Sequence, residues 1–339
     1  MLIRSKAPLR LGLAGGGTDV APFSDLYGGA ILNATISMYA YATIRPLDNG
    51  RIVINAHDKS EHYELEAGEC LEIDGKISLH KGIYNRIVRD FIRKPLSFEL
   101  TTWVDAPPGS GLGTSSTLVV AILGAFTQWL GLPLCEYDLA QLAFEIERID
   151  LGMAGGKQDQ YAATFGGVNF MEFSKDKVIV NPLRVREEYL DELSNNLVLY
   201  HTETSRLSSA IIEQQQKNVT AGNERSIEAM LKLKEQSVMM KEALLKGKLD
   251  TIGEILAFGW EHKKKMAAGI SNPMIDSIYE AALKNGATGG KVSGAGGGGF
   301  MFFYCPGNTR NSVIKALKEF GGQAKRYEFT AKGLTTYCI

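Results

Sequence analysis

Alternating hydrophobic and polar positions predict a strand over residues 97–104. Phe98, Leu100 and Val104 fall on one face of this segment, which is the periodicity of a strand. A pair of prolines follows at 107 and 108 and ends it, because proline donates no hydrogen bond to a sheet. A glycine-rich loop comes next, so a strand leads into that loop.

Helical spacing of apolar positions follows the loop twice. Residues 114–130 are continuously compatible with a helix that opens with Thr and Ser and stops before Gly131. Residues 136–148 repeat the pattern through Leu139, Leu142 and Ile146. The glycine loop therefore lies between a strand and the N-terminus of a helix.

The second half of the chain is predicted to be a separate domain. Residues 183–193 are charged and lack periodicity, so we place a boundary there, between domains 1–185 and 186–339. A short strand at 197–201 and several helices over 205–285 are expected, followed by a β-rich run at 300–304 and a helix at 312–320. The run 263–265, Lys-Lys-Lys, is expected to be a solvated helix face.

Composition then narrows the function. Hydrophobic residues make up 45% of the 339 residues, as in a folded globular enzyme. A formal charge of −1 gives no global field toward nucleic acid or anionic lipid, so we expect a small-molecule partner and no membrane or nucleic-acid partner. Four widely spaced cysteines indicate neither zinc ligation nor a redox dithiol, and the N-terminus lacks a signal sequence, which together favour the cytoplasm. Oligomeric state is not predicted.

Glycine carries the clearest chemical signal. The 37 glycines gather at 12–17, 109–113, 152–156 and 286–299. In the second cluster, glycines without Cβ let backbone N–H groups approach an anion, and the following helix offers unpaired N–H donors and its positive dipole end. Such a loop suits a polyphosphate, although a glycine-rich turn capped by serine would have the same sequence.

Two common nucleotide motifs do not fit. No Gly-x-x-x-x-Gly-Lys-Ser/Thr string occurs, so the loop is not a Walker A loop. Residues 294–299 match Gly-x-Gly-x-x-Gly, but the dinucleotide fingerprint needs a helix directly after the glycines, and the run at 300–304 is predicted to be a strand.

Three separated motifs resemble the GHMP kinases, named for galactokinase, homoserine kinase, mevalonate kinase and phosphomevalonate kinase. They read APLRLGLAGGGTD at 7–19, PPGSGLGT at 107–114 and KVSGAGGG at 291–298. The resemblance implies an α+β, two-domain fold with a ribosomal S5 domain 2-like N-terminal domain and a ferredoxin-like C-terminal domain. It also implies an ATP-dependent kinase that uses Mg²⁺.

The resemblance assigns roles to individual residues. Asp159 would meet the acceptor hydroxyl, Arg10 would stabilise charge on the transferred group, and Glu147 would bind magnesium with Ser115. Glu145 is the alternative metal ligand. The residues expected to cradle ATP are Pro108, Gly109, Ser110, Gly111, Leu112, Gly113, Thr114 and Ser115.

The acceptor is expected to be a sugar. The nine-residue step from Arg10 to Asp19 matches the sugar-kinase branch, and the surrounding residues look most like bacterial heptose kinases and fucokinases. We predict phosphorylation of C1 of D-glycero-D-manno-heptose 7-phosphate, for surface polysaccharide precursors, with a fucokinase or other sugar 1-kinase as the alternative. A non-catalytic sugar or nucleotide sensor is the alternative of another class. The residues expected at the acceptor are Gly17, Thr18, Asp19, Lys157, Arg206, Gly294, Ala295 and Gly296.

Overall fold

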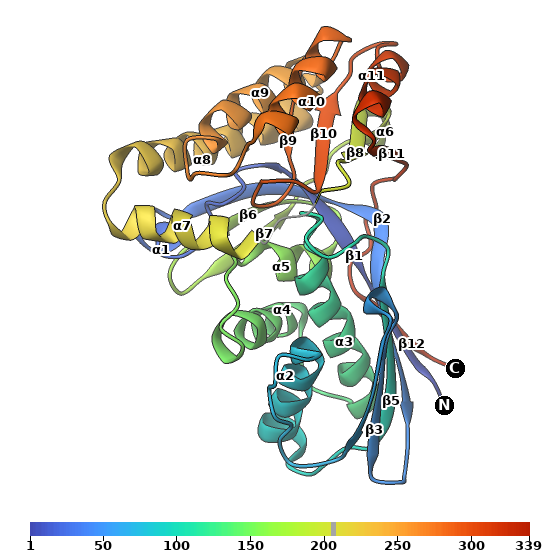
Figure 1. Ribbon diagram of the computed structural model, residues 1–339. Helices are drawn as coiled ribbons and strands as arrows, with labels where there is room; N and C mark the ends of the chain where they lie inside the picture. Colours follow the sequence, from blue (N-terminus) through green and yellow to red (C-terminus); the bar gives the residue numbers. More distant parts are fainter. Residues whose placement is uncertain (205–207) are drawn as a thin grey trace.

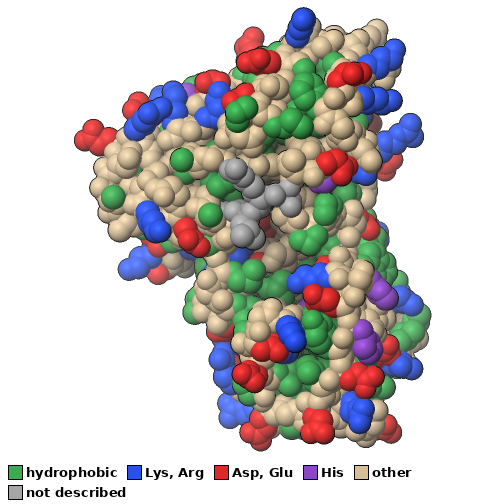
Figure 2. All heavy atoms as spheres, in the orientation of Figure 1, with side chains coloured by type: hydrophobic (Ala, Val, Ile, Leu, Met, Phe, Trp, Pro, Cys, Tyr) green, Lys and Arg blue, Asp and Glu red, His purple; other side chains and the backbone are tan. Residues whose placement is uncertain are grey.

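The computed structural model describes residues 1–204 and 208–339 and has two sheets with helices packed on them (Figure 1). This arrangement is an α+β fold, as the sequence predicts. Among the helices of the described residues, none combines the length and the apolar character needed to cross a bilayer. On the face drawn in Figure 2, acidic and basic side chains are interspersed rather than gathered by sign.

The first sheet is built around one long central strand. The order β12-β1-β2-β5-β3-β4 is extended by β6 and β7, which attach to the first part of β2. Only β3 and β5 pair in parallel. The strands are β1 (Ile3–Ala14), β2 (Gly29–Pro46), β3 (Arg51–Ala56), β4 (Glu61–Glu66), β5 (Phe98–Val104), β6 (Val168–Phe173), β7 (Val178–Pro182) and β12 (Thr335–Cys338).

Helices pack on this sheet because they carry continuous apolar faces. Helix α3 is buried from Ser116 to Phe126 and packs on β1 and β2. It ends at Gly131, whose φ of 64° suits a left-handed C-cap. The helices of this half are α1 (Phe23–Tyr27), α2 (Ser78–Ile87), α3 (Thr114–Leu130), α4 (Glu136–Glu145) and α5 (Gln158–Phe165). The next helix, α6 (Glu187–Asn196), contacts β8 of the second sheet.

The second sheet has the order β11-β8-β10-β9, and all its pairs are antiparallel. Its helices start at defined caps: Asn223 accepts the Ser226 N–H before α8, and Asn272 accepts the Ile275 N–H before α10. The strands are β8 (Leu197–His201), β9 (Gly289–Val292), β10 (Phe300–Tyr304) and β11 (Gln323–Lys325). The helices are α7 (Ser208–Thr220), α8 (Glu224–Lys246), α9 (Ile252–Lys263), α10 (Pro273–Lys284) and α11 (Arg310–Leu317).

One apolar core joins the two sheets. Leu9 and Leu11 of β1 belong to the same buried cluster as Leu199 of β8 and Phe302 of β10. Helices α8 and α9 pack together and both contact β1, and α9 also contacts β9 and β10 of the second sheet. The chain passes from the first sheet to the second between β7 and β8, and β12 returns to pair with β1, which places the two termini together (Figure 1). The predicted domain limits, 1–185 and 186–339, stay a prediction.

The structure adds to the sequence analysis at one segment and corrects it at another. The second part of the stretch 183–193, which shows no clear periodicity, forms α6, a helix whose surface is mostly polar. Lys263 was expected on a solvated face, but its side chain is only 4% exposed. Leu256 and Trp260 precede it at helical spacing on the buried face of α9, so Lys263 continues that face inward.

Candidate active site

A cleft of about 480 Å³ lies where the glycine clusters of both halves meet. This volume is in the range of small-molecule sites, which commonly occur where domains meet. Its walls come from the loop after β1, the loop before α3, the segment before α5, and α7 and α9. The lining residues used below are Arg10, Gly17, Asp19, Gly109, Gly111, Gly113, Thr114, Ser115, Ser116, Glu147, Arg148, Gly155, Gly156, Gln158, Asp159, Glu213, Gln215, Lys263, Gly294 and Ala295.

The loop before α3 has the geometry of an anion cradle. Gly109, Gly111 and Gly113 have φ of 74°, 80° and 79°, a region that glycine enters without strain. No side chain caps the start of α3, so its first N–H groups remain available to a ligand at the cleft. Helix α3 opens at Thr114 and Ser115, which line the cleft. The sequence prediction of a strand, a glycine loop and a helix N-terminus is therefore confirmed.

The rest of this loop anchors it. Leu112 and Ser110 are fully buried, and the Leu112 carbonyl accepts the Arg10 N–H at 3.3 Å. Ser110 contributes its carbonyl, which accepts the Phe300 N–H of β10 at 2.9 Å. Pro108 precedes the loop. Of the predicted ATP residues, the structure thus brings the glycines, Thr114 and Ser115 to the cleft, while Ser110 and Leu112 hold the loop from behind.

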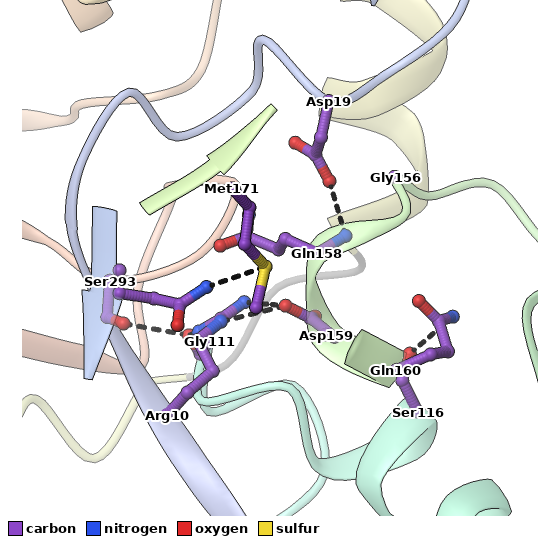
Figure 3. Close-up of polar contacts among 12 residues, drawn as sticks. Arg10, Asp19, Gly111, Ser116, Gly156, Gln158, Asp159, Gln160, Met171 and Ser293 are labelled. Carbon is purple, nitrogen blue, oxygen red and sulfur yellow. Dashed lines mark hydrogen bonds and ion pairs between the residues drawn. The ribbon is translucent and has the colours of Figure 1, made fainter. Parts of the chain in front are cut away.

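Arg10 and Asp159 form an ion pair beside the cradle (Figure 3). The Arg10 guanidinium donates to Asp159 Oδ1 from Nε at 2.7 Å and lies 2.6 Å from it through a terminal nitrogen. Its other terminal nitrogen donates to the Gly111 carbonyl at 2.7 Å. A Cβ on Gly113 would come within 3.0 Å of the Asp159 carboxyl carbon. The carboxylate therefore lies directly against the phosphate cradle.

Glu147 lies at the other end of the cradle, in the single π-helical turn Ile146–Asp150 that follows α4. Its two carboxylate oxygens accept from Ser115 Oγ and Ser116 Oγ, each at 2.6 Å. Gln160 donates to it at 2.8 Å, and the Arg148 guanidinium lies 3.3 Å away. The alternative Glu145 is instead paired with Arg86 at 2.8 Å.

The Glu147–Ser115 pair fits a magnesium ion that takes its remaining ligands from a nucleotide. Mg²⁺ in kinases is commonly bound by one or two protein oxygens together with phosphates and water. Within residues 1–204 and 208–339, no three His, Cys, Asp or Glu side chains gather into a metal cage. The Glu147 carboxylate and the Ser115 hydroxyl at the cleft wall therefore suit a magnesium site that is completed by phosphates and water.

Asp19 is a second carboxylate that lines the cleft. Its side chain is 2% exposed, and Oδ2 accepts the Gln158 N–H at 3.0 Å (Figure 3). Burial raises the pKa of this carboxyl, the Gln158 N–H opposes the rise, and Asp159 adds to it. Gly156 permits the approach, because a Cβ there would overlap the Asp19 carboxylate. Asp19, in the loop after β1, therefore lies against the start of the helix that carries Asp159.

The remaining predicted acceptor residues differ in placement. Thr18 is buried and its hydroxyl donates to the Ala30 carbonyl at 3.0 Å, so it shapes the loop. Gly17 lines the cleft, and its carbonyl accepts from Gln215 of α7 at 2.8 Å. Gly294 and Ala295 also line the cleft, whereas Gly296 packs against Ile270.

Lys157 points away from the cleft. Its ammonium donates to the carbonyls of Ser174 at 3.1 Å and Lys175 at 3.4 Å, in the turn between β6 and β7. Lys157 is not among the residues that line the cleft, so its partnership with a substrate phosphate stays a prediction. Arg206 lies outside the described residues.

Sequence reasoning missed two buried lysines. Lys263 lines the cleft, and Lys291 lies behind it, where its ammonium donates to the Gly12 carbonyl. Burial, reinforced by Arg10 and opposed by Asp19, lowers the pKa of Lys263 to about 8. Burial together with Lys263 and Arg10 lowers the pKa of Lys291 well below its ordinary value. The signal for Lys263 was its position on the apolar face of α9.

Gln160 and Arg148 were also missed. Together with Ser116, whose hydroxyl the sequence offers as a helix cap or a metal ligand, they surround Glu147. The Arg148 guanidinium covers Gly155, where a Cβ would overlap it. Helical spacing would not have found Gln160, because its donor atom acts on a carboxylate of another element.

Comparison with known proteins shows the same architecture elsewhere. The GHMP kinases N terminal domain matches residues 78–167, and the GHMP kinases C terminal domain matches residues 240–323. A D-glycero-alpha-D-manno-heptose 7-phosphate kinase of Campylobacter jejuni is 49% identical over 338 residues, 99% of each chain. The crystal structure of a D-glycero-D-manno-heptose 1-phosphate kinase from Bacteroides thetaiotaomicron matches with a TM-score of 0.85 and 48% identity over 99% of each chain. An L-fucokinase/L-fucose-1-P guanylyltransferase of Bacteroides fragilis is 24% identical over 89% of this chain and 34% of its own length.

Proposed function

Because the chain belongs to the GHMP kinases, we propose that it transfers the terminal phosphoryl group of ATP to the C1 hydroxyl of D-glycero-D-manno-heptose 7-phosphate. The observation that carries this proposal is the 49% identity, across 99% of both chains, to a kinase named for that sugar. The active-site geometry agrees with a sugar kinase, because a carboxylate, an arginine and a glycine cradle meet in one cleft.

The chemistry divides between the two ends of the cleft. The phosphates of ATP bind the N–H groups of the loop 109–113 and the start of α3. The C1 oxygen then attacks the terminal phosphorus, the bond from that phosphorus to the bridging oxygen breaks, and ADP leaves. Asp159 orients the hydroxyl and accepts its proton, while Arg10 stabilises charge on the transferred group.

Magnesium would be held by Glu147 and Ser115. When bound, it neutralises charge on the phosphate oxygens. The protein's own contribution is to fix the Glu147 carboxylate: Ser116 and Gln160 donate to Oε2, and the Arg148 guanidinium lies 3.3 Å from Oε1, the oxygen that also accepts from Ser115.

The acceptor sugar would lie between Asp159 and Asp19. The backbone N–H of Gln158 holds Asp19, and Gln158 and Asp159 are adjacent in the chain, so the distance between the two carboxylates is fixed by α5 and its preceding loop. A pair of fixed carboxylates favours a polyhydroxylated substrate, since one can orient the reacting hydroxyl and the other can bind further hydroxyls.

The compartment expected for this reaction is the cytoplasm. ATP and sugar phosphates are intracellular metabolites, and the four cysteines are all free, as a reducing compartment would keep them. The product, a 1,7-bisphosphate, would serve the synthesis of surface polysaccharide precursors.

A kinase screen tests the proposal. Heptose 7-phosphate, mannose, fucose and galactose are each offered with ATP and Mg²⁺, ADP release is measured, and ³¹P NMR locates the new phosphate. The expected result is a kcat/KM for heptose 7-phosphate well above those for the other sugars, with phosphate on C1. Preference for fucose would favour a fucokinase, and sugar binding without ADP release would favour a sensor; either result contradicts the proposal.

A further inference from the structure

Lys263 is a buried cation that the proposed chemistry does not use. Its side chain is 4% exposed and lines the cleft. With the residues that the structure describes, its ammonium makes no hydrogen bond or ion pair, whereas its neighbour Lys264 is paired with Glu261 at 2.7 Å. Burying an ammonium without a partner is costly, so a buried lysine that faces a cavity indicates that a ligand completes its surroundings.

The charged groups around Lys263 are already engaged elsewhere. Arg10 is bound to Asp159. Lys291 donates to the Gly12 carbonyl, and Asp19 accepts the Gln158 N–H. Arg10, Lys263 and Lys291 thus lie near Asp19 and Asp159, and the exposed Glu213 of α7 also lines the cleft. Of these three cations, Lys263 is the one that makes no hydrogen bond or ion pair with the described residues, so an anionic ligand would supply its partner.

The position of Lys263 indicates the acceptor side of the cleft. A Cβ on Gly16 would lie 3.6 Å from its ammonium nitrogen, and Gly16 belongs to the loop that carries Asp19. Asp19 and Arg10 are the charged groups that act on it. Ser115 and Glu147, at the end where the metal ion and the nucleotide phosphates are expected, are bonded to each other instead.

We propose that Lys263 binds the phosphate group that the acceptor sugar already carries, with Arg10 and Lys291 reinforcing the positive potential there. This inference rests on the proposed function, since it concerns how that same site selects a phosphorylated sugar. A phosphate monoester carries a charge of about −1.5 to −2 at pH 7 and has three strong acceptor oxygens. Those oxygens would supply the partner that the ammonium lacks. The terminal phosphate of ATP has the same chemistry and is the alternative ligand for Lys263.

Binding measurements without nucleotide separate these sources. Titration calorimetry compares D-glycero-D-manno-heptose 7-phosphate with the same heptose lacking its phosphate, in the wild type and in Lys263→Met, Lys263→Arg and Lys265→Met. Methionine keeps the length of the side chain and removes the charge, and Lys265 is an exposed lysine two residues away. A melting curve of each variant verifies that it is folded.

We expect Lys263→Met to bind the sugar phosphate roughly 10- to 100-fold more weakly, which is the range for loss of a charged hydrogen bond. Its affinity for the unphosphorylated sugar should not change, Lys263→Arg should retain part of the affinity, and Lys265→Met should match the wild type. Equal losses for both sugars would place Lys263 on the sugar ring and overturn the inference. Unchanged binding of both sugars, with a lower kcat, would assign Lys263 to the transferred phosphate and overturn it as well.

The outcome for the proposed function is read separately. Wild-type protein that binds heptose 7-phosphate through Lys263 but does not release ADP would contradict the kinase proposal and leave the assignment of Lys263 intact. Normal turnover with no effect of Lys263→Met on sugar-phosphate binding would support the kinase proposal and contradict the assignment of Lys263.

Discussion

At the scale of single residues, Arg10 joins parts of the site that are far apart in the sequence. It leaves β1 and contacts Asp159, 149 positions away, and the Gly111 carbonyl, 101 positions away. Its side chain is 4% exposed, so the guanidinium is held in one geometry by these partners. The Arg10 side chain thus fixes Asp159 relative to the glycine loop before α3.

Replacing Asp159 with asparagine should slow phosphoryl transfer. Asparagine keeps the shape but accepts no proton, so kcat should fall by about 10²- to 10⁴-fold, the usual contribution of a general base. The affinity for ATP should change little, because Asp159 meets the acceptor. Steady-state kinetics with heptose 7-phosphate measure this, and Asp25→Asn, at an exposed residue outside the cleft lining, is the control. A kcat within threefold of the wild type would remove Asp159 from the chemical step.

Lys263 should lower the stability of the free protein. Its pKa falls from the ordinary 10.5 to about 8 on folding, so below pH 8 the folded state must carry a charge that the unfolded chain carries more easily. At ~1.4 kcal/mol per pH unit, the penalty is on the order of 3 kcal/mol at pH 7, and it disappears as the pH rises from 8 to 10.5.

Lys263→Met should therefore raise the free energy of unfolding at pH 7, and the gain should shrink by pH 10. Urea denaturation at the two pH values, with Lys265→Met beside it, measures the difference. A destabilised Lys263→Met protein at pH 7 would show that the ammonium has a stabilising partner in the free protein.

Site residues that stand within a recognisable glycine-rich motif could be predicted from the sequence. Asp159 and Asp19 stand in glycine-rich segments that resemble a known family, so both could be named in advance. Lys157 could not be placed, because the direction of a side chain beside Asp159 depends on the turn between β6 and β7. Lys263 was hidden in a lysine run whose other members are more exposed.

At the scale of elements, the glycine loop before α3 depends on the fourth glycine cluster and the strand that follows it. Gly111 has a φ of 80°, and a Cβ there would overlap the Ser293 carbonyl. Ser293 in turn donates to the Gly111 carbonyl at 2.8 Å, and Phe300 donates to Ser110. Two glycine segments nearly 200 residues apart thus pack backbone against backbone.

Gly111→Ala should therefore cost more than Gly75→Ala. Both glycines have a positive φ, 80° and 85°, but nothing lies within 4 Å of a Cβ at Gly75. Gly75→Ala should lose about 1–2 kcal/mol from left-handed strain alone. Gly111→Ala adds displacement of the loop, which should lower kcat/KM by about 100-fold or more.

Chemical denaturation and kinetics of the two variants check this pair. Equal stability losses, with activity retained in Gly111→Ala, would show that the loop and the Ser293 segment can separate without cost.

Element boundaries were predictable where glycine or alternation marks them. Helix α3 begins and ends at the predicted residues 114 and 130, because Gly113 and Gly131 both take left-handed conformations. The second helix was predicted to run to 148, but α4 ends at Glu145 and passes into a π-helical turn. That turn carries Glu147, and a wider turn is not visible in hydrophobic spacing.

At the scale of the whole molecule, the cleft is stabilised by pairing of the first and last strands and by a core that the two sheets share. Strand β12 pairs with β1, and Leu334 just before it fills the space beside Gly124 of α3. Leu9 and Leu11 of β1 share a core with Phe302 of β10 and Leu256 of α9. The strand that carries Arg10 is therefore packed against both sheets, and neither half can unfold without exposing it.

The 339-residue chain should consequently unfold in a single calorimetric transition, although its length would allow two. A saturating ligand should move the whole transition upward, because the proposed ATP loop 109–113 is hydrogen-bonded to Ser293 and Phe300 of the second half. At 100 times its dissociation constant a ligand adds about 2.7 kcal/mol. Differential scanning calorimetry with and without an unreactive ATP analogue measures this, with agreement between calorimetric and van't Hoff enthalpies as the criterion. Two resolved transitions, of which only one moves with the analogue, would mean that the shared core does not couple the halves, and that nucleotide is held by the first sheet alone.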